Sequence, residues 1–343
     1  MALNASEPIN LPDTVSAIFP NLTFSFEGHV AYIHNTTIQI ATTTTPTRVT
    51  TINPHPAPGM TVSQIKYVAF EGRTFLVVLT TTSTEIWSPD ASERVYFALV
   101  EQTKSGKRPH HRGVAVVGQS LLIGTSDGTL MQLRYANGTF AQVPPAEGGM
   151  LAVHQLPVAD VVGLPLGSPA PASPLHFATA CDRSVALWEL TPAGAAPRPL
   201  GKIDLTSPVT CLDRCGALLF AATSSGEVAV FRDCPDRIQL ICAAQLHALG
   251  VRAMDAHPAT VLGGQGDSDC LLATCAEDST LRLTRVMPDG DSIKLVPLAM
   301  QSATDRLPCG IQFRVGAGGA PVTLMCANYD RTVLTCYDVL PAQ

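Results

Sequence analysis

Short apolar runs alternate with polar turns along almost the whole chain. The clearest copies read LLIGTSDGTLMQLRY from Leu121, LHFATACDRSVALWEL from Leu175 and LLATCAEDSTLRLTR from Leu271. In each copy an apolar run leads into a turn containing Asp, and a second run follows in which apolar and polar residues alternate. Alternation with a period of two places one face of a strand in a core, so each copy predicts a β-hairpin.

The pattern recurs seven times. The predicted turns centre on Asn35, Ser83, Asp127, Asp182, Ser225, Asp278 and Asp330. Successive turns are separated by roughly 40–55 residues, and a blade of a β-propeller repeats about every 40–45 residues. Radial repetition leaves only short, protected sheet edges, so the pattern predicts an all-β chain that folds as a single seven-bladed β-propeller. The blades are expected at residues 12–55, 60–102, 110–145, 150–204, 207–246, 247–300 and 305–341.

The two ends of the chain predict how the last blade is completed. After residue 305 the pattern contains three strand-like runs, one fewer than a four-stranded blade needs. Residues 8–11 are expected to supply the missing strand and so to close the last blade. The first blade would then begin at Val15–Phe19.

Composition excludes several classes of protein and partner. Hydrophobic residues make up 46% and charged residues 15% of the chain, which excludes a disordered protein. A net charge of -6 argues against nucleic acid as a partner. No apolar stretch is long enough to span a membrane, and the N-terminus has no basic and apolar signal regions, so we expect a cytoplasmic protein with no membrane partner.

The sequence predicts neither a metal site nor a cofactor site. The 10 cysteines all follow residue 180 and form no CxxC pair, so we expect small buried apolar side chains rather than zinc ligands or disulfides. The run Gly263–Gly266 has neither the Lys nor the following helix of a phosphate-binding loop. We found no catalytic motif, and no small-molecule substrate is expected.

One copy resembles the WD repeat in detail. Leu246–His247 stands where that family has Gly-His, Thr274 stands at its Ser/Thr position and Asp278 at its turn Asp. The resemblance implies a buried structural network of His247, Thr274 and Asp278. Thr284 stands where the family has Trp.

The fourth copy keeps other parts of that motif. It has Asp182 and Trp188, with His154 as an upstream partner and Ala178 at the Ser/Thr position. No copy carries the complete set, so the resemblance is to a divergent WD-repeat propeller. It implies a stand-alone propeller and no reaction.

A basic segment is the candidate for partner contact. It lies between the second and third blades, and its charged or titratable residues are Lys104, Lys107, Arg108, His110, His111 and Arg112. The segment suits an acidic protein surface, and its alternative reading is a solvated loop.

These observations favour a non-catalytic scaffold or adaptor that binds other proteins in a multi-subunit complex. Its narrower form is a structural subunit of a ciliary or cytoskeletal assembly, by analogy of fold. Two alternatives stay open. One is a module that recognises short peptides or modified tails, and the other is an enzyme with a site in the central channel. The innermost strand segments are mostly Val, Leu, Ala and Cys, which argues against the enzyme.

Overall fold

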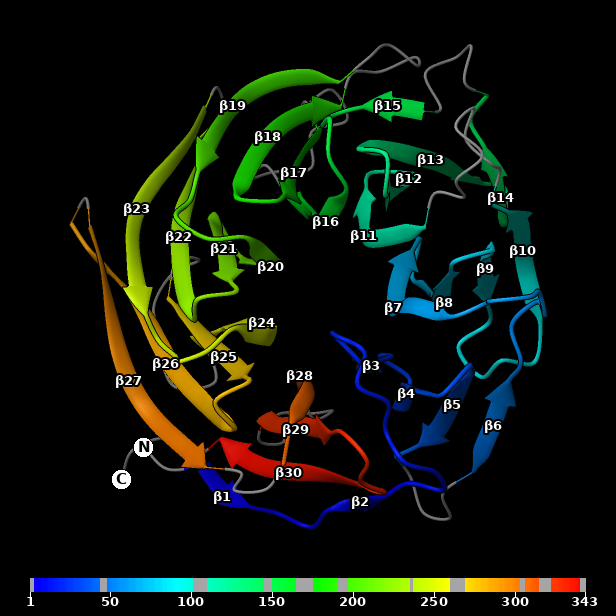
Figure 1. The fold of residues 1–343 in the computed structure, drawn as a ribbon, viewed down its shortest axis with the longest axis horizontal. Helices are drawn as coiled ribbons and strands as arrows, with labels where there is room; N and C mark the ends of the chain where they lie inside the picture. The colour runs from blue at the N-terminus through cyan, green and yellow to red at the C-terminus, as the bar shows by residue number, and fades with distance from the viewer. Residues whose placement is uncertain are drawn as a thin grey trace. The chain divides into compact units, whose positions relative to one another are not determined.

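The structure is a computed structural model, and it describes most of the chain. The described residues are 3–43, 48–100, 110–144, 150–164, 175–190, 197–234, 237–259, 269–290, 292–302, 306–314 and 322–339. Their strands form seven antiparallel sheets, each built mainly from strands that follow one another along the chain (Figure 1). This confirms the prediction of an all-β, seven-bladed β-propeller. Within the described ranges, no helix has the length and apolarity needed to cross a membrane.

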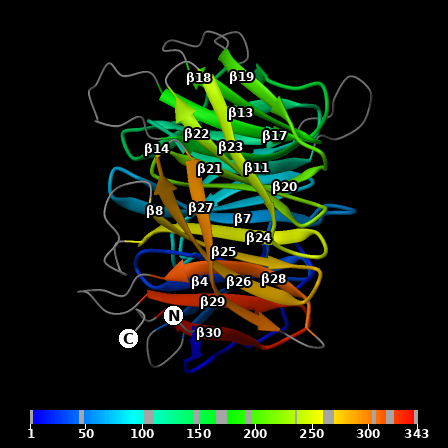
Figure 2. The same ribbon diagram turned by 90° about the vertical axis from the view of Figure 1, so that its left-hand side faces the viewer.

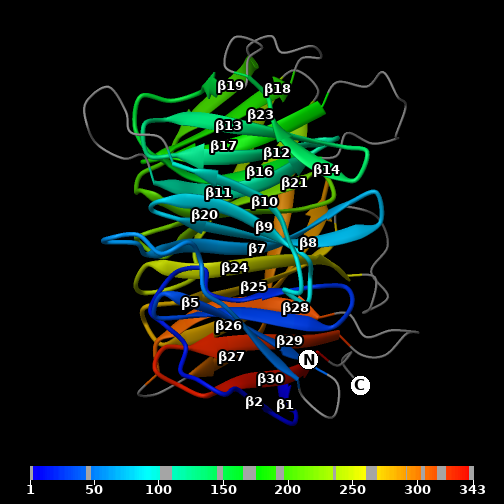
Figure 3. The ribbon, with the colours of Figure 1, turned by 90° about the vertical axis from the view of Figure 1, so that its right-hand side faces the viewer.

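The chain divides into two compact units, and the one that contains residues 23–206 holds four sheets. The strands of these four sheets run from blue to green in Figure 3. The strands of this unit's first sheet are β3 (Thr23–Phe24), β4 (His29–His34), β5 (Thr37–Thr42) and β6 (Val49–Ile52). Those of its second sheet are β7 (Val62–Phe70), β8 (Arg73–Thr80), β9 (Ser83–Trp87) and β10 (Arg94–Leu99). The third contains β11 (His111–Val117), β12 (Ser120–Thr125), β13 (Thr129–Ala136), β14 (Thr139–Gln142) and β15 (Met150–Ala152). The fourth contains β16 (Val158–Leu164), β17 (Leu175–Cys181), β18 (Ser184–Leu190) and β19 (Arg198–Asp204).

The second unit holds three sheets (Figure 2). The strands of its first sheet are β20 (Val209–Cys215), β21 (Leu218–Thr223), β22 (Glu227–Cys234) and β23 (Arg237–Gln245). Those of its second sheet are β24 (Val251–Pro258), β25 (Cys270–Ala276), β26 (Thr280–Asp289) and β27 (Ser292–Ser302). The last sheet contains β28 (Pro308–Arg314), β29 (Val322–Asn328) and β30 (Val333–Val339), together with β1 (Leu3–Ala5) and β2 (Ile9–Asn10).

The N-terminal strands complete the last sheet, as the sequence predicts. β2 pairs with β30 through Ile9 and Leu334, and β1 extends the same edge by pairing Leu3 with Val339. The sequence did not predict β1. The expected first strand at Val15–Phe19 is wrong, because Val15 makes only an isolated bridge to Tyr329. The first sheet begins at β3 instead. The Asn21 side chain donates a hydrogen bond to the Ser16 carbonyl, which folds residues 16–21 into a compact loop.

Apolar side chains fill the spaces between neighbouring sheets of each unit. Between β7–β9 and β11–β14 the core is aromatic, with Phe70, Phe75, Tyr135 and Phe140 at centroid separations of 4.8–5.5 Å. Between β24–β26 and β28–β30 the core is built mainly from smaller side chains, Ala, Cys, Leu and Val, with Phe313 as its buried aromatic residue. Burial of these faces supplies the main stabilisation of each unit.

Most predicted hairpin turns lie where the sequence placed them. Asn35, Asp182 and Asp330 adopt positive φ angles, which Asn and Asp tolerate better than most residues. Ser83 is an exception because it already belongs to β9. There the turn is Thr81–Thr82, and the backbone N–H groups of Thr82 and Ser83 donate to the Thr80 hydroxyl.

In three sheets, the strand that comes first along the chain carries a charged residue at its fifth position. The side chain of this residue reaches the next sheet. The Lys66 ammonium donates to the Val114 carbonyl at 3.0 Å. In the other unit, Asp213 accepts from the Ala256 N–H and Asp255 accepts from the Phe313 N–H, both at 2.6 Å. These charge-assisted bonds fix the spacing of consecutive first strands. The first strands are therefore less apolar than the sequence analysis assumed.

Candidate functional site

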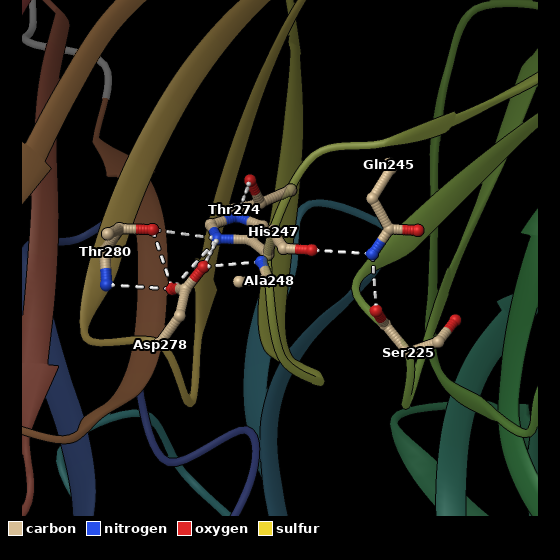
Figure 4. A network of polar contacts seen from close by, with 7 residues as sticks. All are labelled: Ser225, Gln245, His247, Ala248, Thr274, Asp278 and Thr280. Carbon is tan, nitrogen blue, oxygen red and sulfur yellow. Dashed lines mark hydrogen bonds and ion pairs between the residues drawn. The ribbon is translucent and has the colours of Figure 1, made fainter.

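The sheet β24–β27, which we call the His247 sheet, contains a closed polar network (Figure 4). His247 lies in the loop between β23 and β24, Thr274 in β25, and Asp278 in the turn between β25 and β26. His247 Nε2 is 2.8 Å from the Thr274 hydroxyl, and Nδ1 is 3.2 Å from both carboxylate oxygens of Asp278. The three residues that the WD-repeat resemblance groups together are thus in direct contact.

Two further groups complete this network. The Ala248 N–H donates to Asp278 at 2.9 Å, and the Thr280 hydroxyl donates to the same carboxylate at 2.7 Å. Thr280 was missed by sequence reasoning, although a Thr two residues after a turn Asp is a common local hydrogen-bonding pattern. The Gln245 side chain links the network to the preceding sheet by donating to the carbonyls of Ser225 and His247 (Figure 4).

The protonation states follow from burial and these bonds. Burial lowers the pKa of His247 below its ordinary value, and the nearby Asp278 carboxylate offsets part of that effect. Burial alone would raise the pKa of Asp278, but the hydrogen bonds from Thr280 and Ala248 and the proximity of His247 leave it below its ordinary value. A neutral imidazole and an ionised carboxylate therefore tie the loop to the hairpin turn.

The sheet β16–β19, which we call the His154 sheet, contains an open version of this arrangement. His154 Nε2 is 2.7 Å from the hydroxyl of Thr179, and the Trp188 indole N–H donates to that hydroxyl at 2.8 Å. The prediction of Ala178 at the Ser/Thr position is wrong by one residue. Thr179 pairs with Ala186, and a shift of one residue moves a side chain to the opposite face of a strand.

Asp182 does not join this network. Among the described residues, its carboxylate forms no hydrogen bond with His154 or Trp188. The reason is the length of the hairpin. The turn between β17 and β18 contains only Asp182 and Arg183, whereas the turn between β25 and β26 contains Glu277–Ser279.

Of the predicted basic segment, the structure describes only His110, His111 and Arg112. Lys104, Lys107 and Arg108 lie outside the described residues. His110 is exposed and Arg112 is half-buried.

His111 cannot serve as an exposed contact. It lies in β11, its side chain is buried, and Nδ1 is 2.6 Å from the Thr84 hydroxyl. Burial lowers the pKa of His111 to about 4. The prediction that His111 contacts a partner is therefore wrong, because strand alternation turns its side chain inward.

A third polar cluster, around Glu85 in the sheet β7–β10, was not predicted from the sequence. The Glu85 side chain is fully buried, and it accepts from the His55 N–H at 2.6 Å and from the Trp87 indole at 3.2 Å. Arg94 lies 3.5 Å from the same carboxylate and packs over the Phe97 ring at 4.6 Å. Trp87 is half-buried at the edge of this cluster. A Glu two residues before a Trp in a predicted strand was the available signal.

A pocket of about 760 Å³ opens beside the His154 network. Its lining includes His154, Gln155, Leu156, Asp182, Arg183 and Lys202. Burial lowers the pKa of His154 to about 4, and the charge of Lys202 adds to this effect. The imidazole that lines the pocket is therefore neutral at physiological pH.

The cysteines are free thiols, and most of them are buried. Burial raises the pKa of Cys326 to about 12, so this thiol is not a nucleophile at neutral pH. The described part of the chain contains no cluster of three or more His, Cys, Asp or Glu side chains arranged to hold a metal ion. Residues 263–266 lie outside the described ranges.

Comparisons with known proteins bear on the fold. No protein-family model matches the sequence, and no curated protein matches it. A chain of the mitotic checkpoint complex is similar in structure, with a TM-score of 0.70 and 11% identity over 98% of this chain and 92% of that one. Saccharomyces cerevisiae Sqt1 has a TM-score of 0.65 and 11% identity, with both chains covered completely. Chaetomium thermophilum Raptor has a TM-score of 0.62 and 13% identity over 98% of this chain, which spans 30% of the Raptor chain. These likenesses are in fold alone, and in this chain that fold is a seven-bladed β-propeller.

Proposed function

We propose that this chain is a non-catalytic scaffold that binds other proteins as a subunit of a larger complex. The proposal rests on what the buried polar side chains of the chain bind. His247, Asp278 and Glu85 bind loops and turns of their own sheets, so these residues hold the connections between strands in fixed positions. Rigid elements that position surface loops are typical of recognition proteins.

Several of those connections carry large exposed apolar side chains. Phe26 is 92% exposed in the turn between β3 and β4, and Leu249 is 51% exposed beside His247. Tyr329, at the turn after β29, is 48% exposed. Exposed aromatic and aliphatic side chains on ordered turns favour protein contacts over small-molecule chemistry.

The narrower proposal is a structural role in a ciliary or cytoskeletal assembly. It rests on analogy of fold and on the basic residues near Arg112, which suit an acidic surface. The copies of the repeat that begin at Gly113, Ala217 and Leu246 resemble, in sequence and in order, those of WD repeat-containing protein 54. We include a relationship to that protein in the proposal. One chain with a similar structure comes from the mitotic checkpoint complex, a multi-protein assembly by its name.

Sedimentation of the native protein in a gently prepared lysate tests the scaffold proposal. We expect it to migrate in a large particle, with partners that mass spectrometry identifies in the same fractions. The variants F26S and L249S test two exposed turns, and R237A, on a strand at a sheet edge, is the matched surface control. Migration of the wild type as a free species near 36.2 kDa would contradict the proposal. Turnover in a metabolite screen, abolished by a substitution in a first strand, would favour the enzyme alternative.

A second candidate function is recognition of short peptides. The pocket beside His154 favours it, because that pocket combines apolar, cationic and hydrogen-bonding groups.

A further inference from the structure

The loops that carry His154 and His247 have the same backbone arrangement. The N–H groups of Val153 and His154 both donate to the Gly128 carbonyl, at 3.2 and 2.9 Å. In the other sheet, the N–H groups of Leu246 and His247 both donate to the Gly226 carbonyl at 3.1 Å.

The side chains and glycines of the two loops correspond as well. A Cβ added at Gly128 would meet the carbonyls of His154 and Leu156, and one added at Gly226 would meet those of His247 and Leu249. Leu156 is 53% exposed, close to the 51% of Leu249. The two loops therefore present their histidines in equivalent ways.

The difference lies in what occupies the space beside each histidine. In the His247 sheet, the donors His247 Nδ1–H and Ala248 N–H hold the Asp278 carboxylate. The corresponding donors in the His154 sheet are His154 Nδ1 and the Gln155 N–H. Neither has a hydrogen-bond partner among the described residues, and both residues line the pocket.

The hydrogen bonds assign the proton of His154. The Trp188 indole nitrogen can only donate, so the Thr179 hydroxyl accepts from it. Among the described residues, His154 Nε2 is the one acceptor within reach of the Thr179 hydroxyl proton, so the hydroxyl donates to it. In the neutral imidazole the proton is then on Nδ1. His154 offers a donor on its free side, as His247 does toward Asp278.

We propose that the pocket beside His154 binds a carboxylate group of a partner polypeptide, held by His154 Nδ1–H and Gln155 N–H in the way that His247 and Ala248 hold Asp278. This rests on the proposed function only in that the carboxylate belongs to another protein. Lys202 and Arg183 add positive charge to the lining. Leu156 offers an apolar surface for the residues that flank the acidic group.

Two acidic side chains also line the pocket, and neither occupies the donor pair. Asp204 lies 3.2 Å from Lys202 and its side chain is 72% exposed. Asp182 is exposed in the two-residue turn. The Asp182 carboxylate competes with a partner's carboxylate for the positive charge of the pocket. Removal of the Asp182 charge is therefore expected to favour binding of the partner's carboxylate.

The test measures retention of three pools of nine-residue peptides on the immobilised full chain, with sequencing of what binds. The pools have random flanks and differ in one feature: a central Glu with an amidated C-terminus, a central Gln with an amidated C-terminus, or a central Gln with a free C-terminus. We expect at least about tenfold enrichment of a carboxylate pool over the amidated Gln pool, because hydrogen bonds to charged groups are stronger than neutral ones. Enrichment of the first pool assigns a side-chain carboxylate, and enrichment of the third assigns a terminal one. Equal retention of all three overturns the proposal.

Matched variants locate the binding. Replacing Asp182-Arg183 by the three-residue turn Glu-Asp-Ser of the His247 sheet supplies an internal carboxylate and should abolish the enrichment. D182N should increase retention, R183A should reduce it severalfold, and R237A should leave it unchanged. Enrichment that survives both the turn replacement and R183A would overturn the assignment. R183A keeps the test decisive if the turn replacement impairs folding, because Arg183 is exposed.

The outcomes also separate this inference from the scaffold proposal. Migration of the native protein in a large particle without any carboxylate preference would refute the pocket alone. Carboxylate enrichment with a freely migrating native protein would refute the scaffold proposal alone.

Discussion

The His247 sheet and the His154 sheet place a histidine in the same loop position and differ in one residue of hairpin length. In the first, a three-residue turn brings Asp278 to His247 and closes the network. In the second, a two-residue turn keeps Asp182 away, and a pocket lies beside His154. A turn shorter by one residue thus removes the carboxylate that would close the network, and His154 and Gln155 line a pocket instead.

The largest expected effect comes from removing each histidine. H247A should lower the free energy of unfolding by about 3 kcal/mol, because His247 is only 1% exposed and its loss leaves Thr274 and Asp278 without a buried partner. H154A should cost about 1 kcal/mol, because it removes one hydrogen bond of the buried Thr179 hydroxyl and leaves the bond from the Trp188 indole in place. Urea unfolding followed by circular dichroism measures both. Equal losses would contradict the distinction between a closed and an open network.

The second prediction concerns pH and uses His111 and His154. Burial holds the pKa of each at about 4, below the usual value of about 6.5 in an unfolded chain. Between these values the unfolded chain binds more protons, so stability is complete above pH 6.5 and falls as the pH decreases toward 4. For the buried His111 the loss reaches about 3 kcal/mol at pH 4, and for the half-exposed His154 it is smaller.

The variant H111Q tests the pH prediction. It should flatten the dependence of the unfolding free energy between pH 6.5 and 4, while H154Q should flatten it less. If wild type and H111Q show the same slope, His111 is not held neutral in the folded protein.

The smallest expected effect comes from the two turn carboxylates. D278N should lower stability by about 1 kcal/mol, because the amide accepts fewer hydrogen bonds from His247, Ala248 and Thr280. D182N should change stability by less than about 0.5 kcal/mol, as expected for an exposed side chain without a partner among the described residues. Thermal unfolding of the two variants provides the measurement, and a D182N loss as large as that of D278N would show that Asp182 closes its own network.

Much of the fold could be predicted from the sequence because the signals are local. Alternation around Asp127 and the spacing of its repeats predicted hairpins and their number, and the strand at residues 8–11 followed from a missing run in the last copy. Ala178 and Thr179 show the limit of this reasoning. Both are plausible for the WD-repeat position, and only the pairing of β17 with β18 decides which one faces His154.

The repeat and the class of fold could be predicted from periodicity, and the contacts among His247, Thr274 and Asp278 from the resemblance of one copy to the WD repeat. The contacts that polar residues make between copies became evident only in the folded chain. The tertiary structure alone brought Glu85 to His55, turned His111 inward against Thr84, and left the Gln155 N–H beside a pocket. These contacts span about as many residues as those of His247, but no recurring motif marks them, so they depend on sheet register and turn length alone.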